Sequence, residues 1–191
     1  AEIVKNKSDF DAQLSALDSD SHTFLARYPG ELGNSLRVSI CPPDTTAFSA
    51  WSYASSFDQV PSTSTYASAR SASNDEVHVA VIDKNGKFSG TAGTVLETYP
   101  FVSVASDAKN TDGTNNYIKN VINERSEYIY MVGFDSDYNA AGAGTGVDSG
   151  DNFDNGETAA TNYDMAGGVN SGALTTTEFL TGFDLFEDKD Q

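Results

Sequence analysis

The chain has 191 residues, a length that suits one domain with some loosely packed chain attached to it. Hydrophobic residues make up 38% and aromatic residues 11%, so the chain can bury a core and is not wholly disordered. The 28 acidic and 11 basic residues give a formal net charge of -17, which repels phosphate backbones and anionic lipid headgroups. A direct role on nucleic acid or at a membrane surface is therefore disfavoured, although a solvated acidic surface without a specific role explains the charge equally well.

The chain contains one cysteine, Cys41, so no internal disulfide framework is possible. Cys41 follows an alternating apolar run at residues 36–40, and we expect it to be a small buried side chain and not a nucleophile. No apolar run reaches the length of a membrane span, and no signal segment opens the chain. The first residue is Ala1, and the chain stops without an obvious final element, which suggests a fragment of a longer protein.

The first predicted element is a helix that Ser8 caps and that carries Phe10 and Leu17 on its apolar face. Two strands follow, over residues 22–28 and 35–41, and the chain between them is rich in turn-forming residues. The polar stretch after the second strand is expected to be held to the core by a few aromatic side chains: Trp51, Tyr53 and Phe57.

Residues 76–83 give the clearest strand signal, because alternate residues are apolar on both faces. Asn85–Gly86 then predicts a type I′ hairpin turn, and a strand is expected over residues 94–103. A helix is predicted to start within residues 111–114, and a further strand covers residues 127–132.

Composition changes at residue 133, where Gly, Asp, Asn, Ala and Thr begin to dominate. We expect residues 1–132 to form a compact core, residues 133–175 a long acidic surface loop, and residues 176–191 a last element and the start of a linker to a missing next domain. The expected fold class is α+β: a mixed, largely antiparallel β-sheet or two-layer sandwich, flanked by short helices, with a long Gly/Asp-rich loop.

The sequence lacks the residue patterns of the common catalytic sites. Its two histidines, His22 and His78, both fall in strand-like runs, where a histidine is usually a packed residue. No nucleophile elbow, zinc-protease or P-loop pattern occurs, and the glycine-rich run at residues 142–146 lacks the flanking elements of a phosphate-binding loop. We therefore predict a protein that is not an enzyme, with no catalytic residues and no cofactor.

Calcium is the one metal for which the sequence offers a partial ligand pattern. Asp135, Asp137 and Asn139 fit the first ligands of an EF-hand loop. The match then fails, because Ala140 stands where the loop needs glycine and Gly146 where it needs glutamate. The three residues remain weak candidates for a cation site, and no dedicated metal site is predicted.

Two stretches resemble contractile tail sheath proteins of myovirus-type bacteriophages. Residues 26–38, A-R-Y-P-G-E-L-G-N-S-L-R-V, resemble the sheath segment A-[KR]-x-P-G-x-x-G-N-x-[LI]-x-V. Residues 74–97 and 102–109 resemble a sheath pattern in which D-E-x-H-V-x-V-x-D-x-x-G precedes G-T-x-G-T-V-L-E and then S-x-A-S-D-A-K. The residues that carry the resemblance, and to which it assigns a structural role, are Pro29, Gly30, Gly33, Asn34, Glu76, Asp83, Gly90, Gly93, Thr94 and Asp107.

The resemblance implies that the chain is a fragment, the middle domain, of the structural subunit of a contractile tail sheath, which surrounds the tail tube and shortens on infection. It implies a location in the virion tail after assembly in the host bacterial cytoplasm. The implied partners are other sheath subunits and, through the full-length protein, the tail tube and the baseplate and tail-terminator proteins, with no nucleic acid and no membrane. Because the terminal arms of the family are absent, the fragment itself is expected to be monomeric.

Two other functions remain open on the residues alone. An acidic, calcium-stabilised, β-rich extracellular binding module would use the Asp/Gly/Asn-rich loop to hold ions. A hydrolase with paired carboxylates would need a pocket containing a carboxyl group of raised pKa, and the sequence indicates no such pair.

Overall fold

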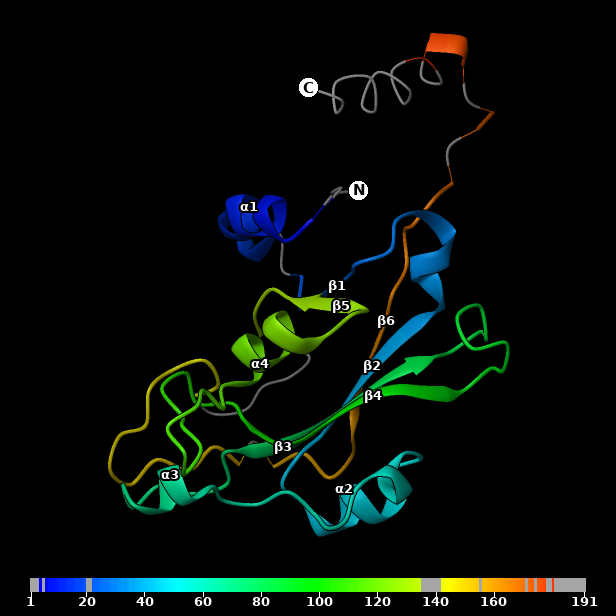
Figure 1. Ribbon diagram of the computed structural model, residues 1–191. Coiled ribbons are helices and arrows are strands. Elements are labelled where there is room, and N and C mark those ends of the chain that lie inside the picture. Colours follow the sequence, from blue (N-terminus) through cyan, green and yellow to red (C-terminus); the bar gives the residue numbers. More distant parts are fainter. Residues whose placement is uncertain are drawn as a thin grey trace.

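A computed structural model of the chain describes residues 4, 6–19, 22–134, 142–154, 156–170, 172–173, 175–177 and 180. In chain order its elements are α1 (Lys7–Ser19), β1 (Phe24–Ala26), the 3-10 helix η1 (Gly30–Ser35), β2 (Leu36–Cys41), α2 (Thr45–Ala50), the 3-10 helix η2 (Ala54–Ser56), α3 (Thr65–Ser68), β3 (Glu76–Asp83), β4 (Thr94–Ser103), α4 (Ile118–Arg125), β5 (Ile129–Met131) and β6 (Thr161–Asp164). The strands form a four-stranded antiparallel sheet of order β4-β3-β2-β6 and a two-stranded antiparallel sheet of β1 and β5 (Figure 1). The α+β prediction is confirmed.

Strand β3 is the centre of the larger sheet. It pairs with β2 in a register that sets Val38 opposite Val81, and with β4 on its other side. Every residue of β3 after Glu76 is buried. Because both faces of the strand are covered, its sequence is apolar at consecutive positions, as the pattern predicted.

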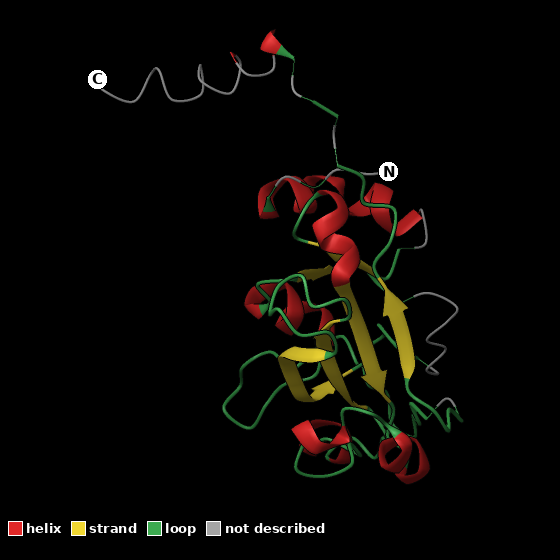
Figure 2. Cartoon of the chain, turned by 90° about the vertical axis from the view of Figure 1, so that its right-hand side faces the viewer, coloured by secondary structure: helices red, strands yellow, loops and turns green. Residues whose placement is uncertain are grey.

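Each face of the larger sheet packs against a different part of the chain. Val77, Val79 and Val81 belong to the main core, together with apolar residues of α4 and β5. Ala80 and Ile82 face the other way and pack with Trp51, from the turn after α2. Figure 1 shows α4 and the β1–β5 pair on one side of the long strands and α2 on the other, and Figure 2 shows helices at both ends of these strands.

Helix α1 forms a further layer on the outside of the small sheet. The ring of Phe10 stacks on that of Tyr130, with centroids 4.5 Å apart, and Leu17 is buried in the same cluster. The helix begins at Lys7, and the side-chain oxygen of Asn6 accepts a hydrogen bond from the backbone N–H of Asp9 at 2.9 Å. The prediction of Ser8 as the cap is therefore wrong by two residues; Asn6 supplies the same kind of acceptor earlier in the chain.

The connection between β3 and β4 is longer than the sequence predicted. Residues 84–93 separate the two strands, and only Gly86 of the expected Asn85–Gly86 turn has a positive φ, +76°. A type I′ turn requires positive φ at both positions, so that prediction is wrong. The Asp83 side chain binds the following amides and organises a wider loop in place of a tight turn.

The helix predicted from residues 111–114 begins later, at Ile118. Asp112 accepts hydrogen bonds from the N–H and hydroxyl of Thr114, and Gly113 has a φ of +84°. A side chain that binds its own backbone two residues on stabilises a turn at the expense of a helix. The strand predicted over residues 22–28 is likewise shorter, at Phe24–Ala26.

The prediction of a loop throughout residues 133–175 is only partly right. Strand β6 lies in this part and pairs with β2, with Tyr163 opposite Val38. Val147 and Phe153 are buried in the main core. Widely spaced apolar residues therefore hold this glycine-rich stretch to the sheet. The boundaries at 132/133 and 175/176 remain predictions, and Asp135, Asp137 and Asn139 lie outside the described residues.

Candidate functional site

The carboxylate of Asp83, at the end of β3, lies at the centre of the most densely bonded polar site in the described residues. It is fully buried and accepts hydrogen bonds from the backbone N–H groups of Lys87, Phe88 and Ser89 at 3.0, 2.9 and 2.7 Å. The hydroxyls of Ser35 and Ser89 donate to it at 2.6 and 2.8 Å. The loop after β3 leaves the sheet, so its backbone N–H groups have no neighbouring strand to bind. The Asp83 carboxylate accepts their hydrogen bonds instead.

The bonding of Asp83 also fixes its charge. Burial by itself raises the pKa of a carboxyl group, but the hydrogen bonds from Ser35, Ser89 and Phe88 outweigh it and hold the pKa of Asp83 well below its usual range. A carboxylate that is ionised and already saturated with donors is a poor general base. The site is suited to holding the loop in shape, not to moving protons.

Other motif residues surround the same loop. Gly90 and Gly93 both have φ near +83°, with open space where a side chain would stand. The N–H of Gly93 donates to the carbonyl of Asp83 at 2.8 Å, and the hydroxyl of Thr94 donates to the carbonyl of Thr91 at 2.7 Å. The two glycines therefore permit the left-handed backbone that brings the chain back to β4.

Pro29, Gly30, Gly33 and Asn34 lie in or just before η1, next to the Asp83 loop. Pro29 precedes η1 in an extended conformation, and Gly30 has a φ of +70°. Gly33 is buried, and a Cβ there would lie 2.5 Å from the carbonyl oxygen of Tyr28. Asn34 bonds through its side-chain amide to the backbone of Gly168, across 134 residues of sequence. Residues 26–38, the first stretch that resembles sheath proteins, thus contact both the second such stretch, residues 74–97, and the chain beyond β6.

Asp107 and Glu76 lie apart from this cluster. Asp107 accepts hydrogen bonds from the N–H of Val147 at 3.0 Å and from the hydroxyl of Tyr66 at 3.1 Å, and so fixes the glycine-rich run to the core. Glu76 accepts from the N–H of Ser62 at 3.3 Å, and burial raises the pKa of its carboxyl group. Both carboxylates thus join a loop to a neighbouring element.

Sequence reasoning missed Asp75, which is as deeply buried as Asp83. It accepts hydrogen bonds from the N–H and hydroxyl of Ser64 and from the hydroxyl of Ser103. The only available signal was a carboxylate next to a strand that is apolar on both faces, and Asp is common in the turns before strands for local reasons. Asp75 joins the loop before β3 to the end of β4.

The histidine in β3 is a packed residue. The ring of His78 stacks on Phe57 with centroids 4.4 Å apart and meets Phe101 edge-on at 4.5 Å. Its Nε2 lies 2.7 Å from the carbonyl oxygen of Gln59, and its Nδ1 accepts from the N–H of Phe101 at 3.1 Å. Burial lowers the pKa of His78, so the ring is held neutral with both nitrogens occupied. Cys41 is buried, and burial raises its pKa to about 12.

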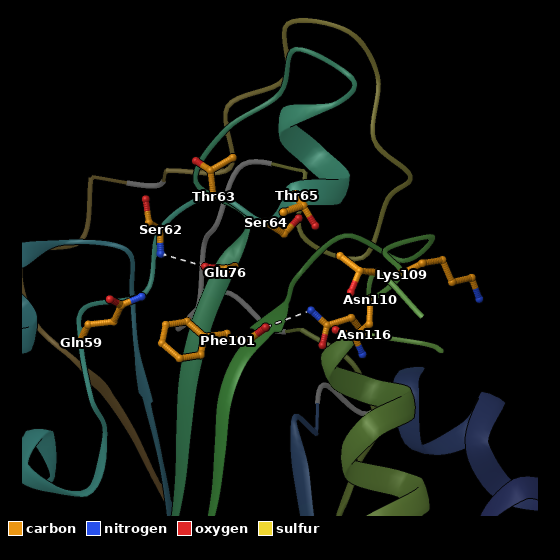
Figure 3. A pocket seen from close by; sticks show the side chains of 11 residues that line it. Gln59, Ser62, Thr63, Ser64, Thr65, Glu76, Phe101, Lys109, Asn110 and Asn116 are labelled. Atoms are coloured by element: carbon orange, nitrogen blue, oxygen red, sulfur yellow. Dashed lines mark hydrogen bonds between the residues drawn. The ribbon is translucent and has the colours of Figure 1, made fainter. Parts of the chain in front are cut away.

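Two adjoining surface hollows share Phe101, Asn110 and Asn116. Their volumes are about 360 and 590 Å³, and Figure 3 shows the smaller one, with mainly polar side chains around it. Phe101 has a φ of +53°, rare for a residue with a side chain, and the Asn116 amide donates to its carbonyl at 2.9 Å. Polar groups that can bind a ligand line both hollows: hydroxyls, Glu76 and Lys109 in the smaller one and Glu97 in the larger.

The described residues also bear on metal and membrane binding. In that part of the chain, no group of three or more His, Cys, Asp or Glu side chains is placed to hold a metal ion. None of its helices has the length and apolar character needed to cross a bilayer.

Comparison with known proteins relates part of the chain to a phage protein. No family model matches the chain. Over 92 residues it is 35% identical to the tail sheath protein of Salmonella phage ViI. The match covers 48% of this chain but only 12% of that protein, so the chain spans a small part of the length of its relative. The chain is thus similar to part of a structural protein of a bacteriophage tail.

Proposed function

We propose that the chain is a structural domain of the sheath subunit of a contractile phage tail. The observation that carries the proposal is the 35% identity to a tail sheath protein over nearly half of the chain. The contacts of Asp83, Asp107 and Asn34 support it, because these motif residues bind backbone groups and hold loops in place. Selection for a fixed shape explains such residues without a reactive centre.

In this proposal the full-length subunit binds copies of itself around the tail tube and contacts the proteins at both ends of the tail. Contraction draws on energy stored at assembly: the extended lattice is metastable, and the shortened lattice has better contacts between subunits. A small free energy per contact becomes large when it is repeated over many identical subunits. The net charge of -17 on this domain should make contacts between copies of it dependent on salt, since screening weakens their mutual repulsion.

Electron microscopy of the full-length product tests the proposal. We expect hollow, striated tubes when the product is expressed alone and concentrated at moderate ionic strength. The amount of sedimented polymer should rise with salt concentration over a series at constant protein concentration. A full-length product that stays monomeric at every salt and protein concentration contradicts the proposal.

The 191-residue chain by itself should behave as a monomer, because its net charge of -17 opposes the association of identical copies. Size-exclusion chromatography with light scattering measures this directly, with an expected mass of 20.3 kDa. A defined dimer or larger ring formed by this chain would show that the domain contains an assembly surface of its own.

A thermal melt separates this proposal from a calcium-stabilised binding module. A module whose loop holds calcium melts at a much higher temperature with calcium than with a chelator, because a ligand that binds only the folded state stabilises it. A sheath domain should melt at nearly the same temperature under both conditions. A large shift with calcium would favour the binding module.

A further inference from the structure

The chain that leaves β6 runs back against η1 and is bound there by side chains. After the N–H of Met165 donates to the carbonyl of Leu36, the next fixed contacts are at Gly168 and Asn170. The side-chain oxygen of Asn34 accepts from the N–H of Gly168 at 2.8 Å, and its NH₂ group donates to the carbonyl of Gly168 at 2.7 Å. One side chain thus satisfies both backbone groups of one residue, as a neighbouring strand does in a sheet.

A second amide closes the contact from the opposite direction. The side-chain oxygen of Asn170 accepts from the N–H of Glu31 at 2.9 Å, so each of the two segments supplies an asparagine that binds the backbone of the other. The contact joins positions more than 130 residues apart in sequence.

Glycine is required on both sides of this contact. A Cβ on Gly168 would overlap the carbonyl oxygen of Gly30 and lie 2.8 Å from the side-chain oxygen of Asn34. A Cβ on Gly30 would overlap the side-chain oxygen of Asn170, and its φ of +70° also favours glycine. By contrast, Gly172 has open space where a Cβ would stand. Gly172 is therefore a nearby position at which alanine meets no neighbouring atom.

Strand β6 is also attached through its ladder with β2 and through Tyr163, whose ring meets that of Phe24 edge-on with centroids 5.2 Å apart. It lies at the edge of the sheet, its residues alternate between half-buried and exposed, and its terminal residue Asp164 is held by ion pairs to Arg37 and Lys84 that are open to solvent. Ion pairs of this kind contribute little to stability. The contact beyond β6 therefore fixes the chain just after the strand, where the solvent-exposed ion pairs hold it only weakly.

We propose that Gly30–Asn34 is a binding site for glycine-containing main chain, which we call the clasp, and that its ligand is residues 168–170 of the same chain. The clasp holds β6 on the sheet and sets the path along which the chain leaves it. The resemblance assigned Gly30 and Asn34 only a general structural role; the contacts give these two residues a specific ligand. The proposal is independent of the sheath function, since it concerns the folded chain alone.

Hydrogen exchange of the full chain, followed by mass spectrometry, tests the clasp. The variants are Asn34→Ala, which removes both bonds to Gly168, and Gly168→Ala, which blocks the approach of the two segments. Gly172→Ala and Asn85→Ala are the matched controls; the Asn85 side chain makes only a 3.5 Å contact to the carbonyl oxygen of Asn34. We expect exchange of residues 161–168 to be about tenfold faster in both clasp variants, with β3 unchanged, and no change in either control.

Two results would overturn the proposal. One is exchange at residues 161–168 that is the same in Asn34→Ala as in the unaltered chain. The other is faster exchange of β3 and β6 to an equal extent, which would mean that the contact supports the whole fold and not this edge. If Gly168→Ala fails to fold, Asn34→Ala still decides between these results, because it only shortens a half-buried side chain.

Discussion

Two neighbouring residues at the end of η1 hold two irregular segments of very different kinds. Ser35 donates to the buried carboxylate of Asp83, in a network whose other donors lie within six residues of that carboxylate. Asn34 binds Gly168 through a neutral, half-buried amide, across 134 residues. One site is charged, buried and nearly local in sequence; the other is uncharged, partly exposed and formed only when the chain has folded.

The difference predicts how each site fails. Loss of the Asp83 carboxylate leaves the buried Ser35 hydroxyl and four partly buried donors without their acceptor, and each such donor costs folding free energy. Loss of the Asn34 amide leaves only two partly buried backbone groups, both of Gly168, without their partner, so its effect should stay small and local. The Asp83 loop therefore supports the fold as a whole, and the clasp supports one edge of it.

The largest expected effect is that of Asp83→Ala. Three backbone N–H groups and two hydroxyls lose their acceptor in a buried site, so we expect a loss of about 3 to 5 kcal/mol in the free energy of unfolding. Urea denaturation followed by circular dichroism measures it. Asp112→Asn is the control, because Asp112 lies in an exposed turn, and its midpoint should match that of the unaltered chain. An equally small change in both variants would contradict the central role of Asp83.

The second effect depends on pH and distinguishes the two sites by their charge. Because the folded pKa of Asp83 lies below the ordinary value of about 3.9, its ionised form stabilises the fold fully above that value. This stability is lost as the pH falls through the folded pKa. Urea titrations at pH 7, 4 and 3 should show the loss in the unaltered chain and a weaker dependence on pH in Asp83→Ala.

The clasp supplies the comparison for that experiment. Asn34 does not titrate and its contact is local, so Asn34→Ala should leave the shape of the curve of stability against pH unchanged. The carboxyl carbon resonance of Asp83 should also show an ionised group at pH 3. A curve in Asp83→Ala that falls as steeply as that of the unaltered chain would assign the acid sensitivity to other carboxylates.

The same comparison shows which parts of the structure the sequence could predict. The alternation in residues 76–83 identifies β3 and the facing of its side chains, because the two-residue period of a strand is local information. The strand predicted over residues 94–103 has the bounds of β4. The turn at Asn85–Gly86 is wrong because the Asp83 side chain competes for the same amides, a contact that turn statistics do not contain.

The contacts across long sequence distances could not be predicted at all. Nothing in the glycine-rich stretch indicates that Gly168 packs on Gly30. Low hydrophobic content favours a loop there, although four residues, Thr161–Asp164, complete the sheet. A short edge strand needs only one well-placed aromatic side chain and a neighbouring strand to pair with. The pairing cannot be recognised from a single sequence.

The third effect, that of Ser35→Ala, tests the connection between the two sites. The substitution removes the 2.6 Å bond to Asp83 in a fully buried position, and we expect a loss of about 1 to 3 kcal/mol. Hydrogen exchange should quicken at residues 84–93 and not at residues 161–168. If residues 161–168 respond as strongly, η1 acts as one unit and the separation into two sites is wrong.

The smallest effect belongs to the ion pair between β2 and β6. The Arg37 guanidinium contacts both carboxylate oxygens of Asp164, at 2.6 and 3.0 Å, and the pair holds the pKa of Asp164 below its usual range. The Asp164 side chain is 44% exposed, so solvent screens the pair, and Asp164→Asn should cost no more than about 0.5 kcal/mol. The cost should vanish in about 1 M salt, because dissolved ions screen the remaining electrostatic attraction between the two side chains. A loss as large as that of Asn34→Ala, persisting in high salt, would mean that the strand itself and not the clasp holds this edge of the sheet.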